Sequence, residues 1–140
     1  MTNSESRQKV ARLIDANLNR LKEGIRVIED INRYIYNDAS LTSQLKSLRH
    51  RLQTLYSQER LHARDIENDV QKKSIESELN RSDIVDLVIA NFSRAQESAR
   101  VLEESFKLID PVSSEIAKEV RYGLYGVEKD FFLQHSVKEP

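Results

Sequence analysis

The residues of this chain best suited to chemistry are arginines and asparagines that occur twice in the same register. Residues 10–29, moved 74 positions along the chain, fall on residues 84–103 with eight identities and no gap. The identical polar residues that matter most for binding are Asn17 with Asn91 and Arg20 with Arg94. Guanidinium and amide groups bind phosphates and carboxylates through directed hydrogen bonds. The pattern therefore predicts a site for an anion to which both halves of the chain contribute.

A second repeat adds two more arginines to this prediction. Residues 46–52, moved 72 positions, fall on residues 118–124 and align Arg49 with Arg121. We expect these two to join Arg20 and Arg94, so that four guanidiniums converge on phosphate groups. Duplication alone does not decide the matter, because a structural arginine is copied as faithfully as one that binds a ligand. A structural role is therefore the alternative for all four.

Other charged residues of the repeats are expected to pair with each other on the solvent side of their helices. Each pair is spaced by four residues, which makes its members neighbours on a helix surface. Exposed pairs of this kind contribute little to stability. The predicted pairs are Arg26 with Asp30, Glu29 with Arg33, Arg100 with Glu104 and Glu103 with Lys107.

Between the repeats lies a crossover, residues 61–79, that belongs to neither copy. It is longer than a plain connection requires, and long connections in compact domains are often functional. It carries Arg64, Asp65 and Asp69, and the spacing of the two carboxylates allows both to face one Mg²⁺ ion. The alternative is a solvated connection with a helical turn near residues 75–79.

Familiar catalytic signatures are absent from the sequence. It contains no glycine-rich phosphate loop, no G-x-S-x-G and no H-E-x-x-H, and it has only 3 glycines. It has no cysteine, which excludes a thiolate nucleophile, a disulfide and a cysteine-ligated metal. A nucleotide would therefore have to be held by side chains and helix ends.

Four amphipathic helices are needed to position these side chains. Apolar residues recur at three- and four-residue spacing over residues 8–37, 41–56, 84–109 and 111–132. The expected caps are Asp38 or Ser40 for the second helix, Asn80 or Ser82 for the third, and Asp110 before Pro111 for the fourth. We expect an all-α fold, a four-helix bundle built from two duplicated helical hairpins with pseudo-twofold symmetry.

The composition predicts a single helical domain over residues 1–140, with repeat one at 8–60, the crossover at 61–79 and repeat two at 80–135. Hydrophobic residues make up 39% and charged residues 32% of the chain. The net charge of −1 favours neither nucleic acid nor an anionic membrane as a partner. No apolar run approaches the ~20 residues of a membrane helix, and no signal peptide is evident. We expect a cytoplasmic protein, monomer or homodimer, that binds small-molecule phosphates.

Several blocks of residues form a distinctive combination along the chain. They are Ile14-Asp15-Ala16-Asn17, Asn19-Arg20, Glu23-Gly24, Arg26-Val27, Glu29-Asp30, Leu48-Arg49-His50, Ala63-Arg64-Asp65, Asp69-Val70, Arg94, Glu97, Arg100, Glu103-Glu104, Arg121-Tyr122, Leu124-Tyr125 and Glu128. Taken together, these blocks resemble a helical domain found at the N-terminus of some bacterial thiamine-phosphate synthases and also as a free-standing protein. The resemblance spans nearly the whole chain, although at residues 66–71 the family commonly has glycines and this chain has none.

The resemblance implies a hydroxymethylpyrimidine-phosphate kinase that uses ATP and Mg²⁺ to make the diphosphate of the thiamin pathway. Combined with the residue types, it suggests phosphate contacts for the four arginines, Arg64 on the transferred phosphoryl group, and Asp65 and Asp69 on Mg²⁺. Asn17 and Asn91 would hydrogen-bond the pyrimidine or a phosphate. The alternative is a non-catalytic module that partners thiamine-phosphate synthase or binds a thiamin intermediate.

Overall fold

Helices are the regular secondary structure of this chain in the computed structural model, which describes residues 4–73 and 79–135. Over those residues there is no strand, so the expected all-α class is confirmed. The elements are α1 (Ser4–Tyr34), α2 (Ala39–Arg51), the 3-10 turn η1 (Leu52–Leu55), α3 (Gln58–His62), α5 (Ile84–Phe106) and α6 (Pro111–His135). The turn expected near residues 75–79 falls mainly outside the described residues.

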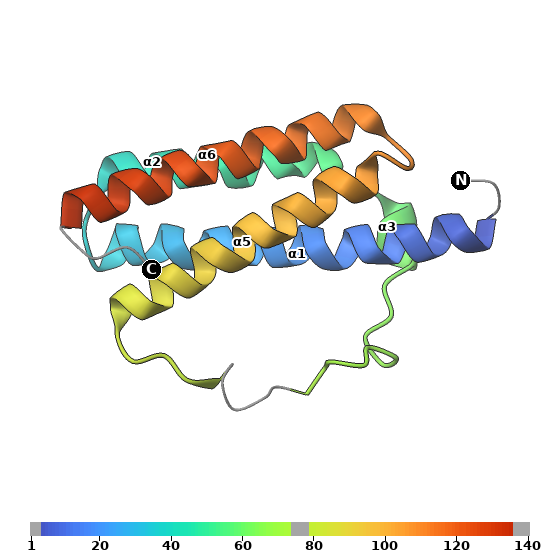
Figure 1. Ribbon diagram of the computed structural model, residues 1–140, viewed down its shortest axis with the longest axis horizontal. Coiled ribbons are helices and arrows are strands. Elements are labelled where there is room, and N and C mark those ends of the chain that lie inside the picture. Colours follow the sequence, from blue (N-terminus) through green and yellow to red (C-terminus); the bar gives the residue numbers. More distant parts are fainter. Residues whose placement is uncertain (1–3, 74–78, 136–140) are drawn as a thin grey trace.

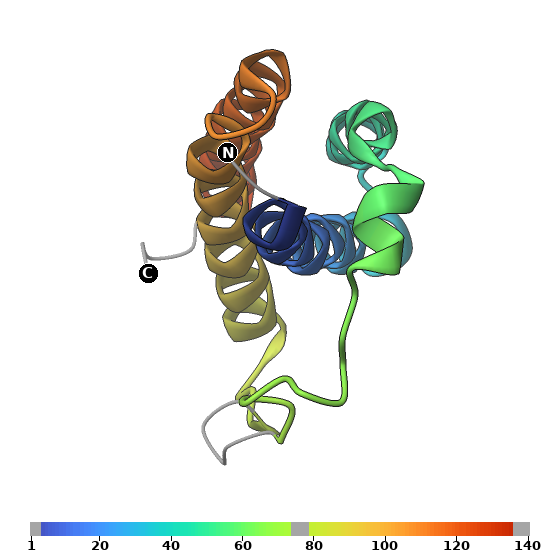
Figure 2. The same cartoon turned by 90° about the vertical axis from the view of Figure 1, so that its right-hand side faces the viewer.

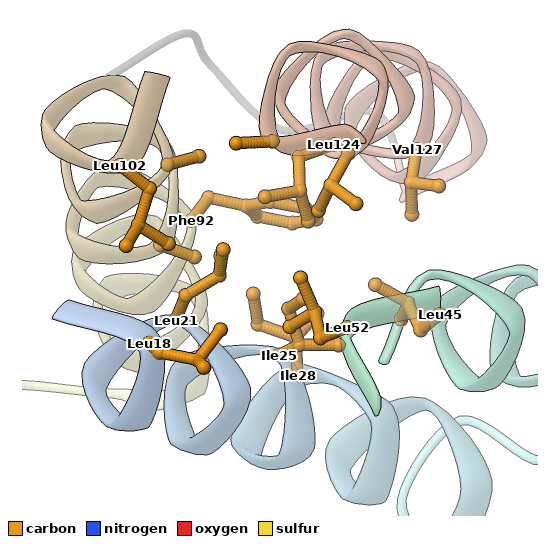
Figure 3. Packing of buried hydrophobic residues seen from close by; sticks show 14 of the residues in the cluster. Leu18, Leu21, Ile25, Ile28, Leu45, Leu52, Phe92, Leu102, Leu124 and Val127 are labelled. Atoms are coloured by element: carbon orange, nitrogen blue, oxygen red, sulfur yellow. The ribbon is translucent and has the colours of Figure 1, made fainter. Parts of the chain in front are cut away.

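The four long helices pack around one apolar core. α1 packs against α5 and α2, and α6 packs against α5 and α2, so the four enclose the space between them (Figures 1 and 2). Leucine, isoleucine and phenylalanine side chains from all four fill that space (Figure 3). Matched positions of the 74-residue repeat are equally buried, since Leu18 and Phe92 are 1% and 0% exposed. The two repeats therefore contribute the same register to the core.

Capping residues set where the helices begin. Asp38 caps α2 as expected, because its side chain accepts a hydrogen bond of 2.9 Å from the backbone N–H of Leu41. The expected cap of α5 was wrong: Asp83, rather than Asn80 or Ser82, accepts from the N–H of Asp86 at 2.7 Å. α6 begins at Pro111, directly after Asp110, as expected.

Two helices end earlier than their apolar pattern suggested. α1 stops at Tyr34 rather than near Asn37, which has a φ of 52° and so cannot continue a right-handed helix. The second helix is α-helical only to Arg51, after which Leu52–Leu55 tighten into a 3-10 turn. Leu52 and Leu55 remain buried, so the apolar pattern reflected their packing rather than the helix type.

A glycine allows α1 and α5 to approach closely where they cross. A Cβ atom on Gly24 would lie 3.3 Å from the Cβ of Ala95 and 3.5 Å from the backbone oxygen of Asn91. The short distance explains why a residue that weakens helices is placed in the middle of α1. This crossing brings the matched polar residues of the two repeats to one surface.

No helix in the described part of the chain is both long enough and apolar enough to cross a membrane.

Candidate functional site

A groove between α1 and α5 is the largest concave feature at the crossing of the two repeats. We call it the α1/α5 groove; its volume is about 590 Å³, within the usual range for small-molecule sites. It brings together the predicted pairs of asparagines and arginines and adds two glutamates. Its polar residues are Asn17, Arg20, Glu23, Gln71, Asn91, Arg94, Glu97 and Ser98. Residues of both repeats therefore line one groove, as a site shared by the two repeats would require.

Arg20 and Arg94 are the cations of this groove. Both side chains are exposed at its walls. To the residues that the structure describes, neither guanidinium makes a hydrogen bond or an ion pair. Their donors are therefore available to an anion in the groove, where a guanidinium can bind two oxygens of one phosphate.

The two asparagines are held in the same way. Asn17 donates from its side-chain amide to the backbone oxygen of Leu13 at 3.0 Å, and Asn91 donates to that of Leu87 at 2.9 Å. Each bond spans four residues of the same helix and uses one of the amide's two N–H groups. The side-chain oxygens have no donor among the described residues. They are therefore suited to accept a hydrogen bond from an N–H group of a ligand.

Glu23 and Glu97 balance the arginines of the groove. Both are exposed and line its wall, so two carboxylates face the same space as two guanidiniums. The two glutamates would repel a purely anionic ligand, whereas the two arginines would attract it. The groove therefore favours a ligand that carries N–H donors as well as a negative group.

A second cavity adjoins the groove beneath the crossover. We call it the crossover pocket; its volume is about 380 Å³. Asn17 and Arg20 line both cavities, so the two are neighbours that share part of a wall. The crossover passes beside α1 before it reaches α5 (Figure 1). The other polar residues of this pocket are Lys9, Arg12, Asp15, Asn19, Arg64, Asp65 and Asp69. All three crossover residues predicted for the site are therefore here.

Two anchors hold the crossover against α1. Asp15, whose residue is only 4% exposed, accepts hydrogen bonds from Arg64 Nε at 2.7 Å and Arg64 Nη2 at 2.8 Å. These hydrogen bonds raise the pKa of Arg64. Arg12 Nη2 donates to the backbone oxygen of Asp65 at 2.9 Å. The conformation of this stretch is therefore set by buried and half-buried charges on α1.

The carboxylates of Asp65 and Asp69 have structural partners. Asp65 accepts from the backbone N–H and the side-chain amide of Asn68, and these bonds lower its pKa. Asp69 accepts from the backbone N–H of Gln71 at 2.9 Å, which leaves its other oxygen without a donor among the described residues. Among all the residues that the structure describes, no group of three acidic or histidine side chains is placed to hold a metal ion. Any metal here would therefore need ligands from a bound substrate.

The expected convergence of four arginines was wrong for Arg49 and Arg121. Arg49 forms two hydrogen bonds to Glu29, at 2.7 and 3.1 Å, and Arg121 likewise holds Glu103 with two donors. Glu29 lies nine residues beyond Arg20 on α1, which rotates it by about 180° around the helix. The same spacing separates Glu103 from Arg94. These ion pairs therefore lie on the far side of α1 and α5 from the groove.

Arg49 keeps the Glu29 carboxyl group ionised in spite of its burial. Its residue is 3% exposed, and this desolvation raises the pKa of its carboxyl group. The hydrogen bonds and positive charge of Arg49 outweigh that effect, so the pKa is lowered overall. The pairs Glu29 with Arg33 and Glu103 with Lys107 were therefore predicted wrongly.

The remaining predicted surface pairs are present. Arg26 lies 3.3 Å from Asp30, and Arg100 lies 3.2 Å from Glu104. Both arginines are half exposed, so the pairs contribute little to stability. Arg26 therefore offers an arginine on α1 that lines neither cavity.

Sequence reasoning missed Arg12 and Asp15 as parts of the site. A signal for Asp15 was present: it stands beside Ile14 on the apolar side of α1, where a charge requires a partner. Glu23 and Glu97 were noted in the repeat without a role. Their place in the groove follows from three-residue spacing after Arg20 and Arg94, which keeps them close to the same helix face.

Comparisons with known proteins place this architecture in context. The model of the ThiD2 family matches residues 12–130. A thiamine-phosphate synthase of Thermosynechococcus vestitus is 40% identical over 127 residues, which is 90% of this chain and 36% of that protein. Thiamine-phosphate synthases of Synechococcus sp. CC9605 and Rhodopirellula baltica are 42% and 36% identical, over 86% and 96% of this chain. The chain spans about a third of the length of these curated relatives. No solved structure matches it.

Proposed function

Because the chain belongs to the ThiD2 family, we propose that it phosphorylates hydroxymethylpyrimidine monophosphate with ATP, giving the diphosphate used in thiamin synthesis. The names of its relatives, thiamine-phosphate synthases, support a place in this pathway. The observation that carries the proposal is a pair of arginines, Arg20 and Arg94, that have no partner among the residues the structure describes and that line a groove next to the crossover pocket.

The reaction asks for little covalent chemistry from the protein. An oxygen of the monophosphate attacks the γ-phosphorus of ATP, a new P–O bond forms, and the bond from that phosphorus to the bridging oxygen breaks. ADP leaves with the electron pair of the broken bond. A phosphate monoester has its second pKa near ~6, so the attacking oxygen carries no proton at neutral pH. A general base is therefore not required, and positioning and charge neutralisation remain.

The described residues can supply both. Arg20 and Arg94 bind phosphate oxygens, and Arg64 presents its remaining donors to the transferred phosphoryl group. Asn17 and Asn91 accept hydrogen bonds from the pyrimidine's amino group, because their side-chain oxygens have no donor among the residues that the structure describes. Arg49 and Arg121 have no part in this assignment, since both are held by buried glutamates.

Mg²⁺ fits the crossover pocket only together with the nucleotide. One carboxylate oxygen of Asp69 accepts no hydrogen bond from the described residues, and Asp65 lines the same pocket. This matches the one or two carboxylates that Mg²⁺ takes beside phosphates. When bound, the ion would neutralise charge on the nucleotide phosphates.

The proposal is tested by comparing arginine variants in a coupled assay for ADP release. A charge-assisted hydrogen bond contributes about 1.5–3 kcal/mol, so Arg20→Ala and Arg94→Ala should lower kcat/KM by roughly 10- to 150-fold. Arg26→Ala, on the same helix as Arg20 but outside both cavities, should change it less than about twofold. Equal losses in all three variants would remove the groove from the reaction.

A binding module is the second candidate, favoured by the length of the relatives. In each of them, about two thirds of the protein lies outside the part matched by this chain. As such a module, the chain would bind the pyrimidine monophosphate or thiamine-phosphate synthase without turnover. This role would be favoured if calorimetry shows binding of the monophosphate but no nucleoside diphosphate is formed from any nucleoside triphosphate.

The duplicated architecture is also part of the proposal. Glu29 with Arg49 and Glu103 with Arg121 form equivalent ion pairs, and the two asparagines make equivalent backbone hydrogen bonds. These correspondences support two related hairpins around a pseudo-twofold axis near Gly24. Superposition of residues 8–56 on residues 82–132 by a rotation near 180° tests it. Unrelated packing of the two hairpins would contradict it.

A further inference from the structure

The two cavities have different chemistry although they share a wall. In the α1/α5 groove, two guanidiniums face two carboxylates and two amide oxygens. The crossover pocket has four cations, Lys9, Arg12, Arg20 and Arg64. Arg64 pairs with Asp15, which leaves three cations, Lys9, Arg12 and Arg20, against the carboxylates of Asp65 and Asp69. The crossover pocket is therefore the more favourable of the two for a highly charged anion.

The anchors of the crossover preserve this difference. Asp15 holds Arg64 from a buried position on α1, and Arg12 holds the backbone of Asp65. In repeat two, Ile89 stands at the position that matches Asp15, so that repeat has no equivalent anchor. The crossover is therefore anchored on α1 and has no matching anchor on α5, so the surroundings of the groove differ between its two sides.

We infer that the cavities are separate substrate subsites that meet at Arg20. The pyrimidine monophosphate lies in the α1/α5 groove with its phosphate on Arg94 and Arg20. The polyphosphate of the nucleotide lies in the crossover pocket against Arg64, with Asp15 as the residue that positions that guanidinium. Arg20, which lines both cavities, contacts the phosphoryl group that passes between them. This division rests on the proposed function.

The charges of the groove carry the assignment of the monophosphate. An aminopyrimidine phosphate offers one anionic group and N–H donors, and the groove offers guanidiniums for the first and carboxylate and amide oxygens for the second. A triphosphate in the same place would lie against Glu23 and Glu97. Near Arg64, a divalent cation on the triphosphate would offset Asp65 and Asp69 instead.

Calorimetry with each ligand alone tests the division. The probes are hydroxymethylpyrimidine monophosphate and a non-hydrolysable ATP analogue with Mg²⁺, and Arg26→Ala is the control. Arg94→Ala should weaken binding of the monophosphate by about tenfold or more and leave the analogue within twofold. Arg64→Ala should do the reverse, and Arg20→Ala should weaken both.

Removal of Arg64 leaves Asp15 buried without its partner, so a second variant guards against simple unfolding. Arg64→Gln combined with Asp15→Asn replaces both charges by amides that can still hydrogen-bond. This double variant should show a cooperative thermal unfolding transition, and it should still lose affinity for the nucleotide analogue only. Loss of both ligands to the same extent, or of the monophosphate alone, would overturn the subsite assignment.

The outcomes separate this inference from the kinase proposal. Selective binding losses without turnover would leave the subsites intact and remove the kinase activity. If the protein turns over its substrates but each variant loses affinity for both ligands equally, the kinase activity stands and the subsite assignment is wrong. A wild-type protein that binds neither ligand would overturn both.

Discussion

Single arginines in this protein differ by whether a carboxylate already holds them. Arg49 and Arg121 each form an ion pair with a glutamate that is 3% exposed. Arg20 and Arg94, in contrast, have no partner in the described part of the chain. The first kind joins helices and the second kind is available to a ligand. Substitution should therefore affect stability at one pair of positions and binding at the other.

Arg49→Ala should destabilise the fold strongly. It leaves the Glu29 carboxylate buried without a partner, and breaking a buried pair in this way costs about 3–5 kcal/mol. Because the Arg49 side chain is 17% exposed, we expect a loss at the lower end of that range. Chemical denaturation should show this loss in the free energy of unfolding. Arg26→Ala should cost less than about 0.5 kcal/mol in the same experiment. A loss for Arg49→Ala as small as that of the control would contradict the structural role.

The stabilisation by Glu29 should depend on pH in a defined direction. Its pKa in the folded protein is below the ordinary 4.5, because Arg49 outweighs the effect of burial. The ionised carboxylate therefore stabilises the fold above pH 4.5, and this contribution is lost as the pH falls through the lower pKa of the folded state. The stability difference between the wild type and Glu29→Gln should shrink below pH 4.5. A difference that grows on acidification would contradict this assignment.

Among the elements, the crossing of α1 and α5 controls the shape of the groove. Gly24→Val adds atoms where even a Cβ would lie 3.3 Å from Ala95, so it should destabilise the fold by about 1–3 kcal/mol. Gly126→Ala is the matched control, because a Cβ there meets nothing within 4 Å. It should stabilise α6 by about 0.5–1 kcal/mol. Thermal melts that rank the two variants in the opposite order would contradict close packing at Gly24.

Helices were predictable here because their signals are local, whereas the partners of charged residues were not. Apolar spacing located all four long helices, and Asp38 and Pro111 marked two of their starts. The contacts of Arg49 with Glu29 and of Arg64 with Asp15 join residues 20 and 49 positions apart. They depend on how helices and crossover fold back, which spacing alone does not determine.

For the whole molecule, duplication was the most informative property of the sequence. It predicted that residues of both repeats would share one groove, and it aligned buried positions in α1 and α5. It did not predict that the surroundings of the groove differ between its two sides, because the crossover that causes this difference has no copy. In the proposed division of the substrates, the nucleotide thus lies beside the crossover, the segment that has no copy in either repeat.

We propose that this molecule transfers a phosphoryl group from ATP to hydroxymethylpyrimidine monophosphate. ³¹P NMR of the purified chain with both substrates and Mg²⁺ would detect this transfer, because the product is identified by its own phosphorus signals. The monophosphate resonance should be replaced by the two coupled signals of a diphosphate ester as ADP appears, and chelation of Mg²⁺ should stop the change. A folded protein that leaves the monophosphate signal unchanged, or that releases inorganic phosphate instead of the diphosphate, would contradict the claim.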